Sequence, residues 1–308
     1  MLSFLIKRLL MLVPVFLAVS AVIFLLVRLV PGDPIDNMIQ IGSSPEQKAA
    51  LIAQYGLDRP VVVQYGVWLK KMLMGDLGEA IVLRQPVSAL IAENLPYSLA
   101  LGGLAFIFST VVGVATGAMA AVNKNGWIDR AVTTLILLGS TVPSFWLGLL
   151  MILLFAVQLQ WFPVSGARNW TAIVLPVLTI GLSGVALVSR VTRAAMLDVA
   201  RQDFVLLLHS KGLSHRRIQL QHVLRHALLP VVAILSLRIG WIVGGAVTIE
   251  FVFARPGLGS LLITSIGQRD YPVVQGCLLM LAVAVMLGTL LGDLAQALMD
   301  PRVRDSLT

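Results

Sequence analysis

The histidines of this sequence, a residue type suited to metal and acid–base chemistry, gather in one segment, residues 190–230. All four histidines lie there: His209, His215, His222 and His226. His222 and His226 are four residues apart, so on a helix they would share a face, a spacing that can hold a metal ion. No aspartate or glutamate lies between residues 212 and 230. We therefore expect polar surface histidines rather than a metal site.

Enzymatic chemistry has no candidate residues. The apolar segments contain no histidine and no pair of acidic residues, which excludes the known constellations of intramembrane proteases. No Gly-Lys-Ser/Thr loop is present for binding nucleotide phosphates, and Lys211-Gly212 has the reverse order. We expect a non-catalytic chain with no cofactor and no metal of its own, so any ATP hydrolysis must come from another polypeptide.

Arg238 is the one charged residue inside a long apolar segment. A charge in a membrane helix costs on the order of 3 kcal/mol on insertion scales. Its side chain could extend to the nearby interface, or it could be paired within the structure. It could also face a translocation pathway and meet an anionic substrate group or an acid of a partner subunit.

Composition places these residues in a membrane protein. Of the 308 residues, 58% are hydrophobic and 12% are charged, with a mean hydropathy of +0.91. Soluble proteins average about 25% charged residues, so the apolar surface of this chain must face lipid. The net charge of +8 is spread over short loops without a nucleic-acid motif. The single cysteine, Cys277, lies in an apolar run and can form no intrachain disulfide.

Long stretches without charge predict an all-α polytopic fold with six membrane helices. Backbone groups in lipid must be paired internally, so such stretches form helices. The predicted spans are residues 9–27, 94–123, 131–159, 169–189, 231–249 and 271–292. The first is too long for a cleavable signal peptide.

The distribution of lysine and arginine predicts the orientation of the spans. Basic residues cluster before the first span, after the second, in residues 190–230 and after the last, whereas short loops on the other side hold only Arg168, Arg255 and Arg269. Cytoplasmic loops carry the excess of basic residues, so both termini should be cytoplasmic. We expect three parts: residues 1–30 with the first span, a periplasmic helical cap over 31–95, and a core domain over 96–308.

Residues 190–230 predict a helix–glycine–helix elbow. Gly212 can end one short helix because glycine tolerates left-handed dihedral angles. Ser214 could then cap a second helix that runs to about residue 229. Such an elbow would fit a groove of a soluble partner, although a solvated basic loop is the other interpretation. Small residues four apart, at Gly113 and Gly117 and at Gly240 and Gly244, predict close helix contacts, the second pair within a pore dimer.

A set of motifs along nearly the whole chain resembles the binding-protein-dependent ABC permeases, and most closely the peptide/nickel subfamily. In chain order they are Pro31-Gly32-Asp33-Pro34, Tyr55-Gly56-Leu57-Asp58-Arg59-Pro60, Gln64-Tyr65, Gly75-Asp76-Leu77-Gly78, Pro143-Ser144-Phe145, a glycine spaced ahead of Leu229-Pro230, Gly244-Gly245, Glu250, Phe253, Pro256-Gly257-Leu258-Gly259, Arg269-Asp270-Tyr271-Pro272 and Asp300-Pro301-Arg302. The sequence departs from the family pattern at Leu208, where a small residue is usual, and at His209-Ser210, His226 and Gln296.

The resemblance implies a type I ABC importer permease fold and a role as a transmembrane permease subunit in the bacterial inner membrane. It implies that Asp203, Lys211, Gly212 and Ser214 couple to the ATPase. Arg238, as a charge within a span, is our candidate for the translocation pathway. Asp33, Arg269 and Asp270 lie in stiff turns at span ends, which we interpret as a rim for the binding protein. Implied partners are a second permease chain, two ATPase subunits that bind ATP and Mg, and a periplasmic binding protein.

Short peptides are the first expected substrate, with nickel chelates, glutathione and opines as alternatives within the same family. A stand-alone channel or secondary transporter is the alternative of another class, and it would need ion-coupling residues in the spans. For that role the predicted spans offer only Arg238.

Overall fold

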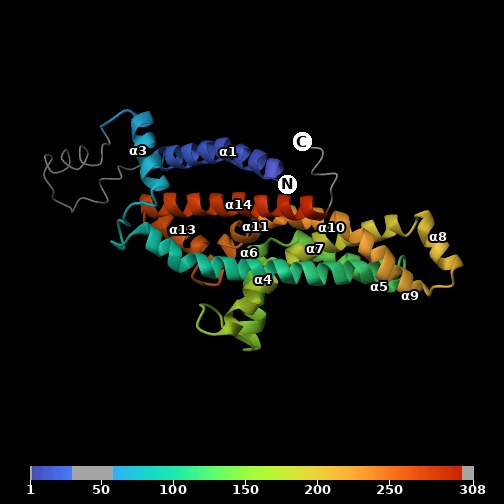
Figure 1. Ribbon diagram of the computed structural model, residues 1–308. Coiled ribbons are helices and arrows are strands. Elements are labelled where there is room, and N and C mark those ends of the chain that lie inside the picture. Colours follow the sequence, from blue (N-terminus) through green and yellow to red (C-terminus); the bar gives the residue numbers. More distant parts are fainter. Residues whose placement is uncertain (1, 30–57, 300–308) are drawn as a thin grey trace.

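The computed structural model describes residues 2–29 and 58–299, and this part of the chain is built from helices (Figure 1). In chain order the elements are α1 (Leu2–Leu29), α3 (Val61–Leu73), α4 (Val87–Val122), α5 (Trp127–Thr141), α6 (Ser144–Met151), the π-helix η1 (Ile152–Gln158), the 3₁₀ helix η2 (Trp170–Ile173), α7 (Val174–Val199), α8 (Asp203–Ser210), α9 (His215–Arg217), the π-helix η3 (Ile218–Val223), α10 (Leu224–Ile239), α11 (Trp241–Gly244), α12 (Val247–Val252), α13 (Leu258–Gly267) and α14 (Tyr271–Met299).

Within the described residues, five helices are long and apolar enough to cross a membrane, and a bent pair would make a sixth. This agrees with the predicted polytopic all-α fold. The five are Leu5–Arg28, Val87–Val122, Trp170–Val199, His215–Ile239 and Tyr271–Leu298. The predicted fifth span, residues 231–249, is misplaced: the long helix begins at the elbow, and the residues after Gly240 form the short helices α11 and α12.

The third predicted span is broken. Residues 127–139 and 144–158 form two helical segments whose axes differ by 101°. Between them Val142 is extended, with φ −79° and ψ 125°, and Pro143 follows. Proline lacks an N–H and disfavours a helical conformation of the residue before it, so the helix ends there. The expectation of one continuous helix over residues 131–159 is therefore wrong.

The two ends of the bundle differ in what they hold. In Figure 1, α8 and α9 lie at one end, which we call the elbow end; the first turns of α1 and the last turns of α14 point toward this end but do not reach it. The opposite end, which we call the cap end, holds α3 and the first turns of α4 and α14. An ion pair of 3.2 Å between Arg8 and Asp293 joins α1 to α14 near the elbow end. The side of the membrane that each end faces stays a prediction.

Glycine and serine residues allow the long helices to approach closely. A Cβ on Gly113 would lie 2.6 Å from the Cβ of Val188, and one on Gly117 would lie 2.5 Å from the Ser189 carbonyl oxygen, so α4 packs directly on α7. A Cβ on Gly288 of α14 would lie 2.7 Å from the Cα of Gly240. Gly240 therefore packs on α14 of its own chain, in place of the predicted contact within a pore dimer.

The described part of the predicted cap, residues 58–95, does not end where we expected. Helix α4 is continuous from Val87 through Pro96, so the boundary at residue 95 falls inside a helix. Helix α3 packs on the last turns of α1. The hydroxyl groups of Tyr65 and Ser20 are 2.9 Å apart, and the rings of Trp68 and Phe24 lie 5.6 Å apart. These contacts anchor the cap to the first membrane helix.

Candidate functional sites

The elbow has the predicted helix–glycine–helix geometry. Helix α8 ends at Ser210, and Gly212 has φ +77°, the left-handed conformation that favours glycine. Ser214 occupies the N-cap position of the second helix, but its hydroxyl makes no capping hydrogen bond; its carbonyl accepts the N–H of Ile218 at 3.1 Å. The second helix continues past Pro230 to Ile239, further than predicted.

An apolar cluster holds the elbow rigidly on the ends of the long helices. Val205 of α8 is buried against Met196 of α7 and against Ile218 and Val223 of the second helix. Leu208, where we noted a departure from the family pattern, is partly buried against the same cluster. Leucine at this position therefore contributes to the packing that joins the elbow to α4, α7 and α10.

The outer face of the elbow exposes both apolar and polar side chains. Leu206 is 70% exposed and Leu207 is 56% exposed, although both are large hydrophobic residues outside the long spans. The four predicted coupling residues, Asp203, Lys211, Gly212 and Ser214, are also exposed, on α8 and in the turn that follows it. Sequence reasoning missed the two leucines, although adjacent apolar residues in a basic loop were a visible signal. Exposed apolar residues rimmed by polar ones are typical of protein interfaces.

The histidines make ring contacts at the elbow end. The rings of His209 and His215 are stacked across the turn at Gly212, with centroids 5.9 Å apart. His226 contacts the ring of Phe204 at 5.2 Å. Nowhere in residues 2–29 and 58–299 do three or more histidine, cysteine or acidic side chains group as metal ligands would. Of the i, i+4 pair of His222 and His226, His226 is therefore used for packing against Phe204.

Arg238 lies between three helices at half depth in the bundle. Its Nη1 donates to the Gly184 carbonyl of α7 at 3.3 Å. A Cβ on Gly184 would lie 2.7 Å from both terminal guanidinium nitrogens and 2.6 Å from the Cβ of Ser109 on α4. The guanidinium therefore occupies a space that the glycine leaves open. The Arg238 side chain is half-buried.

A second polar cluster lies toward the cap end, around Glu250 of α12, which is 1% exposed. Its Oε2 accepts the N–H groups of Gly259 at 2.8 Å and Ser260 at 3.3 Å, at the start of α13. The two preceding N–H groups, of Gly257 and Leu258, donate to Asn94 Oδ1 at 3.1 Å and Ser98 Oγ at 2.8 Å on α4. We call Glu250, Asn94 and Ser98 the clasp.

The clasp satisfies the first N–H groups of α13, which have no partner inside the helix. A carboxylate at this position is also favoured by the helix dipole. A Cβ on Gly257 would lie 2.3 Å from the Glu250 carboxyl carbon, so the turn needs glycine there. Our sequence analysis used Glu250 only as a motif residue; a lone acid nine residues before a Gly-Ser pair was the available signal.

The predicted rim residues have different surroundings. Asp270 is 2% exposed, and its carboxylate accepts the N–H of Val82 at 2.9 Å and that of Val273 at 3.5 Å. It therefore holds the start of α14 against the segment before α4. Arg269 is exposed, with φ +55°. Asp33 lies outside the described residues.

A partly buried ion pair braces the elbow end. Arg193 of α7 donates from Nε and Nη2 to the two carboxylate oxygens of Asp129 on α5, at 2.7 and 2.8 Å. The N–H of Asn125 also donates to Asp129 at 2.9 Å. Bidentate pairs of this kind are strong and directional. We had assigned Arg193 to the basic loop, but α7 extends to Val199 and carries it.

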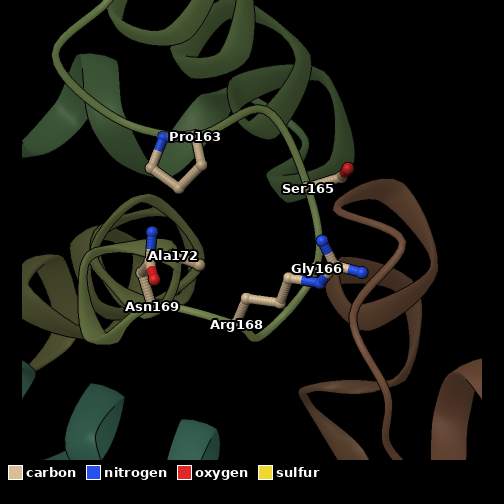
Figure 2. A pocket seen from close by; sticks show the side chains of 6 residues that line it. All are labelled: Pro163, Ser165, Gly166, Arg168, Asn169 and Ala172. Atoms are coloured by element: carbon tan, nitrogen blue, oxygen red, sulfur yellow. The ribbon is translucent and has the colours of Figure 1, made fainter.

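A cavity of about 380 Å³ lies beside the loop between η1 and α7. Figure 2 shows the residues that surround the cavity. The Ser165 side chain points away from the cavity, and the Arg168 side chain extends along the rim of the cavity toward Gly166. The Gly166 carbonyl accepts Arg255 Nη1 at 3.4 Å. The cavity is lined by Pro163, Ser165, Gly166, Arg168, Asn169 and Ala172. The polar groups do not converge on one point, so we assign no ligand to it.

Comparison with known proteins adds relatives that match along the whole chain. Two family models match: residues 113–305 match "Binding-protein-dependent transport system inner membrane component", and residues 1–102 match the N-terminal model of such membrane components. A putative peptide transport system permease protein of Brucella abortus is 40% identical over 312 residues, covering 99% of each chain. The glutathione transport system permease protein GsiC of Salmonella typhimurium is 39% identical over 308 residues, again covering 99% of each.

Solved structures support the fold. A structure of the MetNI methionine ABC transporter in an inward-facing conformation matches with a TM-score of 0.56 and 21% identity, over 68% of this chain and 95% of that chain. An amino acid ABC transporter matches with a TM-score of 0.51 and 18% identity, over 70% and 94%. At these identities the likeness shows the fold alone, which is the type I ABC importer permease fold that the motifs predicted.

Proposed function

Because the chain belongs to the family of binding-protein-dependent transport system inner membrane components, we propose that it is the transmembrane permease subunit of an ATP-driven ABC importer for short peptides. The observation that carries this proposal is the match along 99% of the chain to permeases named for peptide and glutathione transport. Glutathione is the second candidate substrate, since one of these relatives carries its name.

We propose that the elbow seats in a separate ATPase subunit. Its outer face combines Leu206 and Leu207 with Asp203, Lys211 and Ser214, and its inner face is packed on three long helices. An ATPase subunit that binds this face would bury the apolar side chains and pull on the helices. The ATPase subunits, and not this chain, would bind ATP and Mg.

The orientation follows from the same proposal. The elbow end faces the cytoplasm of a bacterial inner membrane, and the cap end faces the periplasm and the binding protein. Arg269, exposed near the cap end, fits a contact with the binding protein. The Asp270 carboxylate is used inside the chain, so we propose that it shapes this rim rather than touches the partner.

A second permease chain, different in sequence, would complete the pore. One side of α7 exposes a stripe of residues at helical spacing: Ser183, Leu187, Arg190, Ala194 and Asp198. Polar and charged groups are costly against lipid, so this stripe favours contact with a pathway or a partner. We place Arg238, beside Gly184, on that pathway.

The test is reconstitution of the chain in liposomes with its second permease, its ATPases and its binding protein. A labelled tripeptide should enter only when ATP and the binding protein are both supplied. An ATPase subunit whose phosphate-binding lysine is replaced should stop uptake. Uptake that continues without ATPase subunits would contradict the proposal and favour a channel or secondary transporter. Preferential uptake of glutathione over other tripeptides would select the second candidate.

A further inference from the structure

The depth of Arg238 within the helix bundle follows from helix lengths. At 1.5 Å per residue, about 20 Å of helix separates it from Arg225 near the elbow. Its neighbour Gly184 lies about 15 Å along α7 from Val174, where that helix begins. The hydrocarbon core of a bilayer is about 30 Å thick. Both lengths are half of that thickness or more, which places the guanidinium near the middle of the span that α7 is long enough to form.

At that depth Arg238 has little compensation from its own chain. A guanidinium carries five N–H donors. The structure provides one hydrogen bond, of 3.3 Å, to the Gly184 carbonyl. Within the described ranges, no acidic residue forms an ion pair with it, whereas Arg193 and Arg8 are paired with Asp129 and Asp293. These two arginines thus have acids within the chain, and Arg238 has none among the described residues.

The space around Arg238 is shaped by small residues. Gly184 has no side chain, and Ser109 turns its hydroxyl back to the Phe106 carbonyl at 3.0 Å. A side chain at residue 184 would collide with the guanidinium. The exposed stripe of α7 begins at Ser183, the residue next to this glycine. The guanidinium is therefore positioned, half-buried, where a polar face of the bundle begins.

We infer that Arg238 is a carboxylate-binding residue of the translocation pathway and favours substrates that carry a free carboxylate. Its unused donors form the planar fork that matches a carboxylate in a bidentate pair. The main-chain carboxylate of a short peptide has this chemistry, as do the carboxylates of glutathione. The inference deepens the proposed importer function, on which it rests, by naming the substrate group that the pore itself recognises.

The experiment compares a tripeptide with its C-terminal amide in the reconstituted complex. The peptide pair is chosen so that both members bind the periplasmic binding protein equally, and uptake is measured with that protein in excess. The wild type should import the free acid about tenfold faster than the amide. In Arg238→Gln, uptake of the free acid should fall to the rate of the amide. Arg238→Lys should keep part of the preference, because it retains the charge but not the fork.

Arg130→Gln is the control. Arg130 is an exposed arginine of α5 and lies outside the exposed stripe of α7. Its ratio of acid to amide uptake should equal that of the wild type.

Each outcome of the comparison has a defined meaning. A wild type that imports neither peptide would overturn the peptide proposal, and the inference with it. A wild type that imports peptides, with an Arg238→Gln variant of unchanged ratio, would overturn only the carboxylate site. Equal loss of both peptides in Arg238→Gln, with a normal amount of complex, would overturn it too, and would indicate a pair with an acid of the second permease.

Discussion

Two short helices join long helices at opposite ends of this molecule, and they are stabilised in opposite ways. Helix α13, toward the cap end, has its first N–H groups bonded to Glu250, Asn94 and Ser98 of the same chain. Helix α8, at the elbow end, has no side-chain cap and exposes Leu206 and Leu207. The first N–H groups of α13 are thus bonded within the chain, whereas α8 exposes apolar side chains to its surroundings.

The difference indicates that the contacts around α13 are made within this chain, whereas the surface of α8 is suited to binding another protein. The first N–H groups of α13 all have acceptors, and such buried hydrogen bonds hold an element in one position. Exposed apolar side chains on a well-packed base instead form a surface for binding. We therefore expect substitutions in the clasp to act on the stability of the chain, and substitutions on the elbow face to act on assembly and coupling.

The largest effect is expected for Glu250→Ala. It removes a charged acceptor from two buried N–H groups, and each such bond is worth about 1.5–3 kcal/mol, so the loss is about 3–6 kcal/mol. The variant should fail to accumulate in membranes, as measured by immunoblotting of membrane fractions. Glu93→Ala, an exposed acid on α4 beside Asn94, is the control and should accumulate normally. Equal amounts of both variants would show that the clasp is dispensable.

A smaller effect, confined to function, is expected for the double variant Leu206→Asp, Leu207→Asp. Both side chains are exposed in the isolated chain, so its amount in the membrane should not change. Two charges on the contact face should lower ATP-dependent uptake about tenfold or more, because apolar burial at the interface is lost. Co-purification of the ATPase subunit measures this directly. Val62→Asp on the exposed surface of α3 should retain the ATPase; loss of the ATPase in that variant alone would reverse the assignment of the two ends.

The smallest effect is expected for alanine substitutions at two glycines near the ends of the short helices: Gly212, which follows α8, and Gly267, the last residue of α13. Gly212 and Gly267 both have open space where a Cβ would lie, but only Gly212 has a positive φ. Gly212→Ala should therefore destabilise the chain by about 1 kcal/mol, and Gly267→Ala should not destabilise it. Thermal unfolding in detergent measures the difference. A lower melting temperature for Gly267→Ala than for Gly212→Ala would contradict the conformational argument.

The predictions made from sequence succeeded where the signal was local. Runs without charge located the first, second, fourth and sixth spans. Each residue of a helix that faces lipid must itself be apolar, so the signal for a span lies within its own sequence. Gly212 marked the elbow, since a left-handed residue depends on its own backbone. Leu229-Pro230 misled us about the second helix, because Pro230 is tolerated inside α10 and the helix continues to Ile239.

The sequence predictions failed where contacts between residues far apart in the sequence determine the structure. Pro143 was visible, but the direction of the chain after it depends on packing of α6: a Cβ on Gly148 would lie 3.2 Å from Phe253 and 3.5 Å from Thr179. Asp270 was assigned to an exposed rim from its place in a turn. Its burial depends on Val82, far away in the sequence.

The amino-acid sequence by itself determined that this chain lies in a membrane as a helix bundle and that its basic segment forms an elbow. These properties follow from composition, periodicity and single-residue backbone preferences. Only the tertiary structure decided that Glu250 meets α4 across the clasp, that Gly184 makes room for Arg238, and that Leu206 and Leu207 face outward. Such facts depend on which helices become neighbours, and helix packing is set by the combined shape of many side chains rather than by any one segment.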